Sequence, residues 1–235
     1  MVHIGIIPDG NRRWCKKNNL DVNDLVKHWS NIIIENIYNN KKKRMSKNLK
    51  DITEVSFYVC SIDNINRNDN TKFIIYDFIR LIYNSYKDPK KLLKEHNIEY
   101  SEEDYKICQE YLKELNYNFI GEIQILPEDI KNIINELTQN NNPQNKFILN
   151  LAIAYDYNKD LLNFERTDFK NYDRKQSDID LIFRSGGEYR TSGFFPTKTL
   201  YSELFFLKKL WPEITIDDFI NVMKKFQKRN RRFGK

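Results

Sequence analysis

The chain has 235 residues, of which 40% are hydrophobic and 31% are charged, and this length suffices for one substantial core or at most two small ones. An aromatic fraction of 14% argues against a disordered chain, and only 7 Gly and 6 Pro argue against a collagen-like or low-complexity sequence. The formal net charge of +6 admits nucleic acid, an anionic membrane surface or phosphorylated small molecules as partners.

We expect no segment to span a membrane. The longest apolar stretch, Phe147 to Tyr155, falls well short of the roughly 20 residues that a spanning helix needs. The run Ile4 to Ile7 is too short for a standard signal peptide. Three widely spaced cysteines, Cys15, Cys60 and Cys108, cannot form a disulfide framework, which favours a reducing compartment. The sequence therefore predicts a cytoplasmic protein.

The hydrophobic pattern predicts strands that alternate with helices. Strands are expected at Val2 to Ile7, Ile52 to Cys60, Phe119 to Leu126, Phe147 to Tyr155 and Ile179 to Arg184, with a further candidate at Glu203 to Leu207. Helices are expected from about Asn11, over Thr71 to Tyr86, from Ser101 through Leu115, from Pro127 to about Leu137, and from Thr215. Such alternation is typical of an α/β fold, here a single domain (1–235) with a mostly parallel central sheet flanked by helices.

Polar clusters follow three of the predicted strands, at Pro8 to Arg13, Ser61 to Arg67 and Arg184 to Ser192. In open α/β sheets, ligands bind beyond the carboxyl ends of the strands. Because the three clusters fall at those ends, we expect them to form one site on one rim of the sheet.

The first cluster combines a carboxylate with a turn that leads into a helix. The free N–H groups of a helix N-terminus favour phosphate, and Arg12 and Arg13 add positive charge. Asp9 would repel a bare phosphate, so its presence fits a Mg²⁺ ligand; the alternative is that Asp9 only caps the helix. The Walker P-loop pattern is absent.

The last cluster contains a glycine pair between two arginines. Arg184, Arg190 and the Ser192 hydroxyl are well suited to clamp a diphosphate. Glu188 and Glu203 follow, and each is a candidate metal ligand, an ion-pair partner for the arginines or a surface charge.

The middle cluster and the histidines carry weaker signals. Asn64 and Arg67 follow a strand, where an Asn can cap a helix, orient a substrate or simply form a turn. The spacing of the three histidines does not fit a zinc site. His28 is either a semi-buried structural histidine or a donor to phosphate.

These motifs together resemble those of the cis-prenyltransferases, the undecaprenyl and dehydrodolichyl diphosphate synthases. His3 to Trp14 resembles the opening motif of that family. The C-terminal signature is matched by Asp180 to Ser192, Tyr201 to Phe206, Leu210 to Pro212 and the ending Arg231 to Gly234. The resemblance runs from residue 3 to residue 234 and is weak from about 70 to 145.

The resemblance implies one α/β domain with an apolar tunnel, acting as a homodimer. It implies an enzyme that condenses isopentenyl diphosphate with an allylic diphosphate, such as farnesyl diphosphate, to make a Z-polyprenyl diphosphate with Mg²⁺. Peripheral membrane contact for product release is expected, and nucleic acid is not expected as a partner.

The resemblance also assigns roles to individual residues. Asp9 and Asn64 are expected to be catalytic, with Asp9 and Glu203 binding Mg²⁺. The allylic substrate is expected to contact Gly10, Asn11, Arg12, Arg13, Trp14 and His28. The remaining substrate contacts are expected at Ser61, Asp63, Arg67, Arg184, Arg190, Thr191 and Ser192.

Two departures from the family pattern concern charge. Arg12 stands where a Gly is usual, and Asp24 stands where an Arg that contacts the allylic diphosphate is usual. We hypothesise that Arg12 compensates for the lost Arg. Two alternatives to an active enzyme are a non-catalytic subunit of the same fold and a basic nucleic-acid-binding module. Non-catalytic subunits of this fold usually lose the Asp of the first motif, whereas Asp9 is present here.

Overall fold

The computed structural model describes residues 1–21, 25, 51–69, 71–90, 94, 101–145, 147–166 and 177–231. Their centre is a six-stranded sheet in the order β3-β4-β2-β1-β5-β6, in which every neighbouring pair is parallel. The strands are β1 (Val2–Ile7), β2 (Ile52–Tyr58), β3 (Leu115–Ile120), β4 (Phe147–Ala152), β5 (Leu181–Arg184) and β6 (Glu203–Phe206). The predicted α/β fold with a parallel sheet is therefore confirmed.

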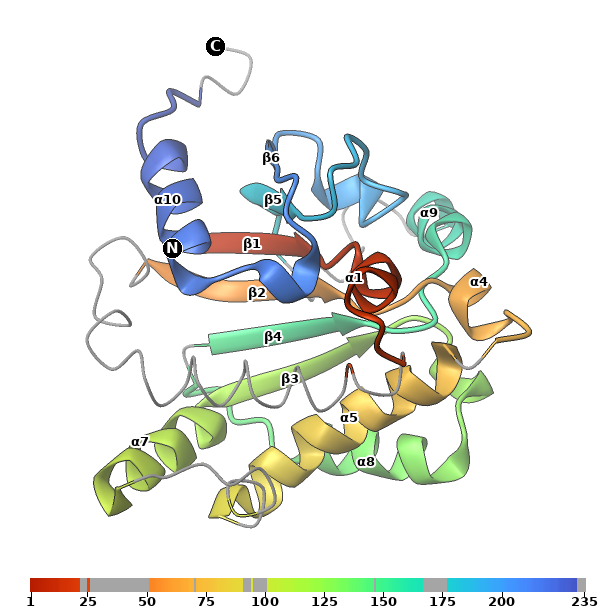
Figure 1. The fold of residues 1–235 in the computed structure, drawn as a ribbon, viewed down its shortest axis with the longest axis vertical. Coiled ribbons are helices and arrows are strands. Elements are labelled where there is room, and N and C mark those ends of the chain that lie inside the picture. The colour runs from red at the N-terminus through yellow and green to blue at the C-terminus, as the bar shows by residue number, and fades with distance from the viewer. Residues whose placement is uncertain are drawn as a thin grey trace.

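Helices connect the strands and cover the sheet (Figure 1). They are α1 (Asn11–Asn18), α4 (Ile62–Ile65), α5 (Thr71–Lys87), α7 (Glu102–Lys113), α8 (Glu128–Gln139), α9 (Tyr157–Arg166) and α10 (Ile216–Phe226). The strands all point the same way in Figure 1, and α1, α4 and the start of α9 lie near their carboxyl ends. Within the described residues, no helix is both long and apolar enough to cross a bilayer.

Two of the three clusters of buried side chains in the core pack helices against the sheet. Helices α5 and α8 pack on β2 and β4 through fully buried side chains such as Ile79 and Ile130. Helix α10 packs on β1 and β5, where the Phe219 ring stacks on Phe183 with centroids 4.4 Å apart. Burial of apolar area on this scale is the main stabilising term of the fold.

The C-terminal helix begins where its sequence predicts. The Asp218 carboxylate accepts hydrogen bonds from the backbone N–H of Thr215 (2.9 Å) and from its hydroxyl (3.0 Å), which is the expected capping box. Helix α1 likewise begins at Asn11 as predicted.

Several predicted boundaries were wrong. The third strand is Leu115–Ile120 rather than Phe119 to Leu126, and the preceding helix ends at Lys113. Gly121, at φ 133°, ends the strand, and a short 3-10 helix (Ile123–Ile125) follows. Helices α4 and α9 were not predicted, and β2 and β4 each end two or three residues earlier than expected.

Replacing Gly121 by Ala is expected to destabilise the fold strongly. A Cβ at this position would lie 2.0 Å from the carbonyl oxygen of Ile153, and φ is positive. We expect the free energy of unfolding to fall by roughly 3 kcal/mol or more in urea denaturation. Gly187→Ala is the control, because φ is 75° but the nearest atom is 3.9 Å away. That variant should lose only about 1–2 kcal/mol, and equal losses for the two variants would contradict the steric argument.

Candidate active site

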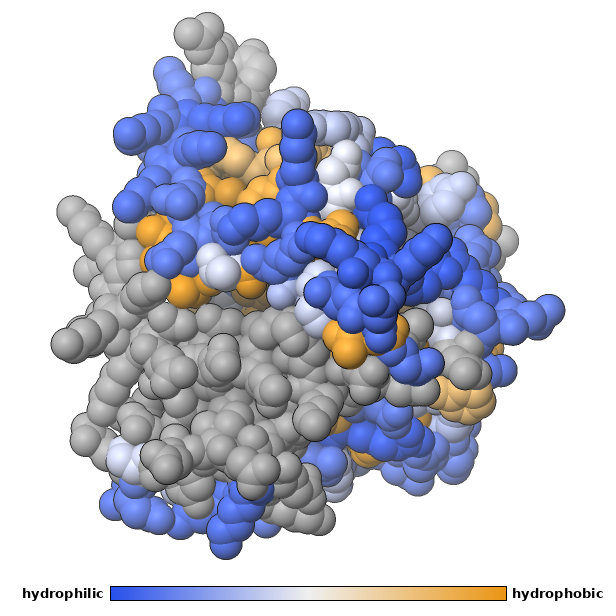
Figure 2. Space-filling model, viewed as in Figure 1, coloured by the Kyte–Doolittle hydropathy of each residue, from blue (hydrophilic) through white to orange (hydrophobic). Residues whose placement is uncertain are grey.

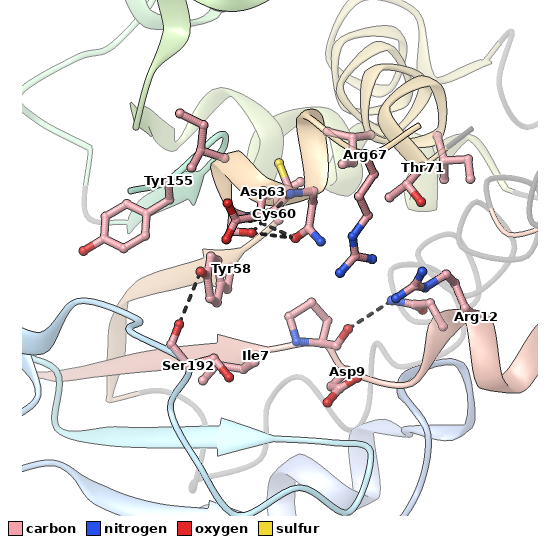
Figure 3. Close-up of a pocket in the computed structure, with 18 of the residues that line it drawn as sticks. Ile7, Asp9, Arg12, Tyr58, Cys60, Asp63, Arg67, Thr71, Tyr155 and Ser192 are labelled. Atoms are coloured by element: carbon pink, nitrogen blue, oxygen red, sulfur yellow. Dashed lines mark hydrogen bonds between the residues drawn. The ribbon is translucent and has the colours of Figure 1, made fainter. Parts of the chain in front are cut away.

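A cavity of about 720 Å³ lies at the carboxyl ends of β1, β2, β4 and β5, beside α1, α4 and the start of α5 (Figure 3). All three predicted polar clusters contribute to its wall. The predicted site residues that line it are Asp9, Gly10, Asn11, Arg12, Arg13, Ser61, Asp63, Asn64, Arg67, Arg184 and Ser192. The expectation of one site on one rim is thus confirmed in the described part of the chain.

Asp9 is fixed in the wall by both its side chain and its backbone. Its Oδ2 accepts a hydrogen bond from Arg184 Nη2 (2.9 Å), and its Oδ1 accepts one from Arg13 Nη2 (3.1 Å). Its carbonyl oxygen accepts from the Ser185 hydroxyl (2.8 Å) and from the backbone N–H of Trp211 (2.9 Å). The carboxylate therefore has little freedom, although 29% of its side chain remains exposed.

The charge state of Asp9 follows from these contacts. Partial burial raises its pKa, but the hydrogen bonds and charges of Arg184 and Arg13 outweigh this effect and hold the pKa below its usual value. Asp9 is therefore ionised at neutral pH and can act as an oxygen ligand.

Arg184, at the end of β5, is buried and donates hydrogen bonds to several residues of the site. Only 4% of its side chain is exposed, and besides Asp9 it donates to the Ser192 hydroxyl (2.9 Å) and to the Arg190 carbonyl. Its Nε is buried without a hydrogen-bond partner. The fork of Arg184 is thus largely used to position Asp9 and Ser192, rather than being held free for a diphosphate.

Helix α1 presents its N-terminus to the cavity. Its N-cap is Gly10, at φ 106°, and no side chain caps the helix. The alternative that Asp9 serves as the cap is therefore wrong. A Cβ on Gly10 would lie 2.8 Å from Leu210, so a close contact as well as the positive φ requires glycine here. The first N–H groups of the helix remain available to an anion.

The middle cluster forms the short helix α4 rather than a simple turn. Asn64 Oδ1 accepts from both the N–H (3.0 Å) and the hydroxyl (3.1 Å) of Ser61, and the N–H of Asn64 is within hydrogen-bond reach of the Ser61 hydroxyl oxygen (3.3 Å). This reciprocal cap fixes the Asn64 side chain, so that the donors it has left are the two on Nδ2.

Apolar and phenolic side chains complete the wall. Leu25, Ile74 and Ile75 line one part of the cavity. Tyr58 and Tyr155 lie on another side, and the Tyr58 hydroxyl donates to the Ser192 carbonyl (3.4 Å) (Figure 3). Burial raises the pKa of Tyr58 to about 12, so it is a neutral hydrogen-bonding group. The cavity thus joins a cationic part to an apolar part.

Some predicted residues lie away from this wall. Trp14, Arg190 and Thr191 are not among its lining residues, and the Arg190 guanidinium pairs with Glu188 (2.5 Å). Glu188 is thus an ion-pair partner for an arginine, one of the three roles considered for it. His28, like Asp24, lies outside the described residues.

Glu203 is not brought to Asp9 within one chain. It pairs with Arg229, and it begins β6, level with Leu181. Arg184, which contacts Asp9, is three residues further along β5, or roughly 10 Å at the rise of a strand. The Mg²⁺ site of Asp9 and Glu203 that the resemblance implies is therefore not assembled within one chain.

Other lining residues were missed in the sequence. Tyr155, Asp156 and Tyr157 follow β4 and reach the same rim as the three clusters. The rule that ligands bind beyond the carboxyl ends of strands would have found them, had it been applied to the fourth strand as well.

The Asp9–Arg184 contact should make stability depend on pH. A carboxylate with a lowered folded pKa contributes stability above its unfolded pKa of about 3.8, and this is lost as the pH falls through the folded value. We therefore expect the difference in free energy of unfolding between the wild type and Asp9→Asn to be constant above about pH 5 and to shrink below about pH 4. Urea denaturation between about pH 3 and 6 measures it, and a difference that stays constant across this range would contradict the assignment.

The site also fits a divalent cation that needs only one or two protein ligands. Among the described residues, no group of three His, Cys, Asp or Glu side chains is close enough to hold a metal ion. Mg²⁺, however, usually binds through one or two carboxylates, several waters and substrate phosphates. The ionised, partly exposed Asp9 supplies one such carboxylate at the cavity wall.

Known proteins share both the sequence pattern and the fold. Residues 7–234 match the family model described as "Putative undecaprenyl diphosphate synthase". Over 253 aligned positions the chain is 32% identical to the tritrans,polycis-undecaprenyl-diphosphate synthase (geranylgeranyl-diphosphate specific) of Sulfurisphaera tokodaii, covering 99% of this chain and 87% of that protein. An isoprenyl transferase of Treponema denticola is 27% identical, with 99% and 96% covered.

Solved structures agree at the level of the fold. Lavandulyl diphosphate synthase from Lavandula x intermedia, crystallised in complex with dimethylallyl diphosphate, matches with a TM-score of 0.72 at 22% identity, covering 99% of this chain and 98% of that one. The family match covers nearly the whole sequence, including all three polar clusters of the cavity, and the solved structure has the same fold. The chain belongs to the undecaprenyl diphosphate synthase family of cis-prenyltransferases and is a prenyl-transferring enzyme.

Proposed function

We propose that this enzyme condenses isopentenyl diphosphate with an allylic prenyl diphosphate to make a Z-polyprenyl diphosphate. A bond forms between C4 of isopentenyl diphosphate and C1 of the allylic substrate, whose C1–O bond breaks and releases diphosphate. A proton leaves C2 of the isopentenyl unit, so that atoms and charge balance. The observation that carries the proposal is the joining of a cationic and an apolar part in one cavity.

The chemistry requires a site that binds two polyanions close together. Arg12, Arg67 and the N-terminus of α1 line the cavity and can neutralise the charge that develops on the departing diphosphate. Leu25, Ile74 and Ile75 offer apolar surface to a prenyl tail. An elongated apolar tunnel for the product remains a prediction.

Asn64 can contact a substrate only as a hydrogen-bond donor. Because its Oδ1 already accepts two hydrogen bonds from Ser61, its remaining groups are the Nδ2 donors. We propose that Nδ2 holds a diphosphate oxygen in position. A diphosphate oxygen fixed in this way is the natural acceptor of the proton from C2.

Mg²⁺ is proposed as the cofactor, held by Asp9 and by substrate phosphates. When bound, it would neutralise diphosphate charge and assist departure of the leaving group. Arg184 and Arg13 keep the carboxylate ionised and oriented for this role.

The primer and the assembly are proposed on separate grounds. The Sulfurisphaera tokodaii relative is named as geranylgeranyl-diphosphate specific, so geranylgeranyl diphosphate should be tested beside farnesyl diphosphate. A homodimer is supported by apolar side chains exposed on the outer strand β6 and just before it, where Leu204, Tyr201 and Leu200 are 41%, 63% and 81% exposed. In such a dimer, Glu203 of a second copy could approach Asp9, and sedimentation of the pure chain tests the assembly.

Incubation of the pure enzyme with radiolabelled isopentenyl diphosphate, Mg²⁺ and each primer tests the reaction. We expect labelled, solvent-extractable prenyl diphosphates longer than the primer, which chromatography resolves by chain length. EDTA should abolish their formation. No elongated lipid from the pure chain, but elongation after a partner chain is added, would instead support a non-catalytic subunit.

A further inference from the structure

Arg12 forms an exposed ion pair that contains no hydrogen bond, unlike the contacts of Arg13 and Arg184 with Asp9. Its Nη1 lies 3.6 Å from Asp69 Oδ2, too far for a hydrogen bond, and the two side chains are 57% and 46% exposed. Exposed pairs of this geometry hold their partners weakly. Arg12 can therefore exchange Asp69 for another anion at little cost.

The arginines on the β1–β5 side of the cavity are already neutralised. Arg184 and Arg13 share the Asp9 carboxylate, and Arg13 also lies 3.9 Å from Glu188. On the opposite side, Arg67 lines the cavity and, among the described residues, forms no ion pair within 4 Å, although its charge acts on the Asp69 carboxylate. Among the described lining residues, Arg12 and Arg67 are thus the arginines whose charge is least neutralised by a carboxylate.

These two arginines line the same cavity. In Figure 3, Arg67 extends from the segment between α4 and α5 toward α1 and Arg12. Asp69 follows Arg67 in that segment, and its Oδ1 accepts a hydrogen bond from the N–H of Thr71 at the start of α5 (3.0 Å). Asp69 therefore lies between the positive charges of Arg12 and Arg67, beside the cavity that both arginines line.

We infer that Arg12 is a specificity-determining residue for the longer, allylic prenyl diphosphate, and that Asp69 acts as its competing anion. In the free enzyme Asp69 occupies Arg12; on binding, a diphosphate oxygen displaces the Asp69 carboxylate and bridges Arg12 and Arg67. This inference rests on the proposed function, because it names which diphosphate the two arginines take.

The apolar lining favours the allylic substrate over isopentenyl diphosphate. Ile74 and Ile75 lie on the first turns of α5, which begins at Thr71, and Leu25 lines the same cavity. A diphosphate held between Arg12 and Arg67 can place a prenyl tail against these side chains. Isopentenyl diphosphate, with five carbons, gains much less from such a surface.

A purely structural role for the Arg12–Asp69 pair predicts a different effect of removing Asp69 on substrate binding. If the Arg12–Asp69 contact only held α1 against the segment before α5, removing either partner would loosen this part of the cavity wall. Binding of the allylic diphosphate would then weaken in both variants. If Asp69 competes with the substrate, removing its charge strengthens binding while removing Arg12 weakens it. Both roles predict weaker binding without Arg12, so the direction in which Asp69→Asn changes binding decides between them.

The experiment measures binding of unreactive farnesyl thiodiphosphate and, separately, of isopentenyl diphosphate by calorimetry at about 0.15 M salt. Arg12→Ala should weaken farnesyl thiodiphosphate binding roughly tenfold or more, Arg12→Lys by less, and Asp69→Asn should tighten it about two- to threefold. The side-chain oxygen of an Asn at this position can still accept the hydrogen bond from the Thr71 N–H. Binding of isopentenyl diphosphate should change less than twofold in each variant.

Matched controls remove the same charge elsewhere. Lys16→Ala lies on the exposed side of α1, and Asp77→Asn lies on the surface of α5; both should bind as the wild type does. Weaker binding by Asp69→Asn, or equal binding by Arg12→Ala and Lys16→Ala, would overturn the inference while wild-type turnover still supported the reaction. A wild type that binds no prenyl diphosphate would overturn both.

Discussion

Asp9→Asn is expected to lower kcat for prenyl transfer by roughly 10³-fold or more. The substitution keeps the size of the side chain but removes the charge that would hold a divalent cation against the substrate phosphates. Loss of Lewis-acid assistance is worth several kcal/mol in the transition state, which corresponds to this factor. Initial rates with radiolabelled isopentenyl diphosphate at saturating primer measure the effect.

Two comparisons make the Asp9 result specific. Asp9→Glu keeps the charge but moves it by one methylene group, so it should retain more activity than Asp9→Asn. Asp77→Asn removes a surface carboxylate that pairs with Arg80, and should leave kcat unchanged. If Asp9→Asn kept more than about a tenth of wild-type kcat, a catalytic role for the carboxylate would be refuted.

Arg184→Met is expected to damage stability and activity together. Arg184 is 4% exposed and joins Asp9, Ser192 and the Arg190 carbonyl. Removing one member of a buried pair leaves the other without its partner, which costs about 3 kcal/mol or more in free energy of unfolding. We expect kcat/KM to fall roughly 10²-fold or more, because Asp9 loses the group that orients it.

The double variant Asp9→Asn/Arg184→Met separates pairing from packing. With both charges removed, the loss of stability should be smaller than the sum of the two single losses, because no buried charge is left unpaired. Arg80→Met, at an exposed ion pair, should change stability little. Losses that add within about 0.5 kcal/mol would show that the pair is not energetically coupled.

The sequence predicted the architecture well because its signals are local. Apolar runs such as Val2 to Ile7 identify buried strands, and Thr215 with Asp218 identifies the start of α10. The joining of three polar clusters into one cavity followed from a general property of parallel sheets.

The features that could not be predicted depend on tertiary contacts. The end of β3 is set by the close approach of Gly121 to the carbonyl of Ile153, which lies beyond β4. The use of Arg184 to hold Asp9 depends on the pairing of β5 with β1. Glu203, by contrast, was predicted at the start of a strand, and that position already implied the amino end of the sheet, away from the site.

The central claim is that one cavity binds both diphosphates, with Asp9 and Arg184 on one side and Arg12 and Arg67 on the other. A crystal structure with farnesyl thiodiphosphate, isopentenyl diphosphate and Mn²⁺ in place of Mg²⁺ tests it most directly. The account predicts two diphosphates in the cavity, anomalous density for Mn²⁺ beside the Asp9 carboxylate, and Arg12 turned from Asp69 toward the allylic diphosphate. Diphosphates bound outside the cavity, or a metal ion with no contact to Asp9, would contradict it.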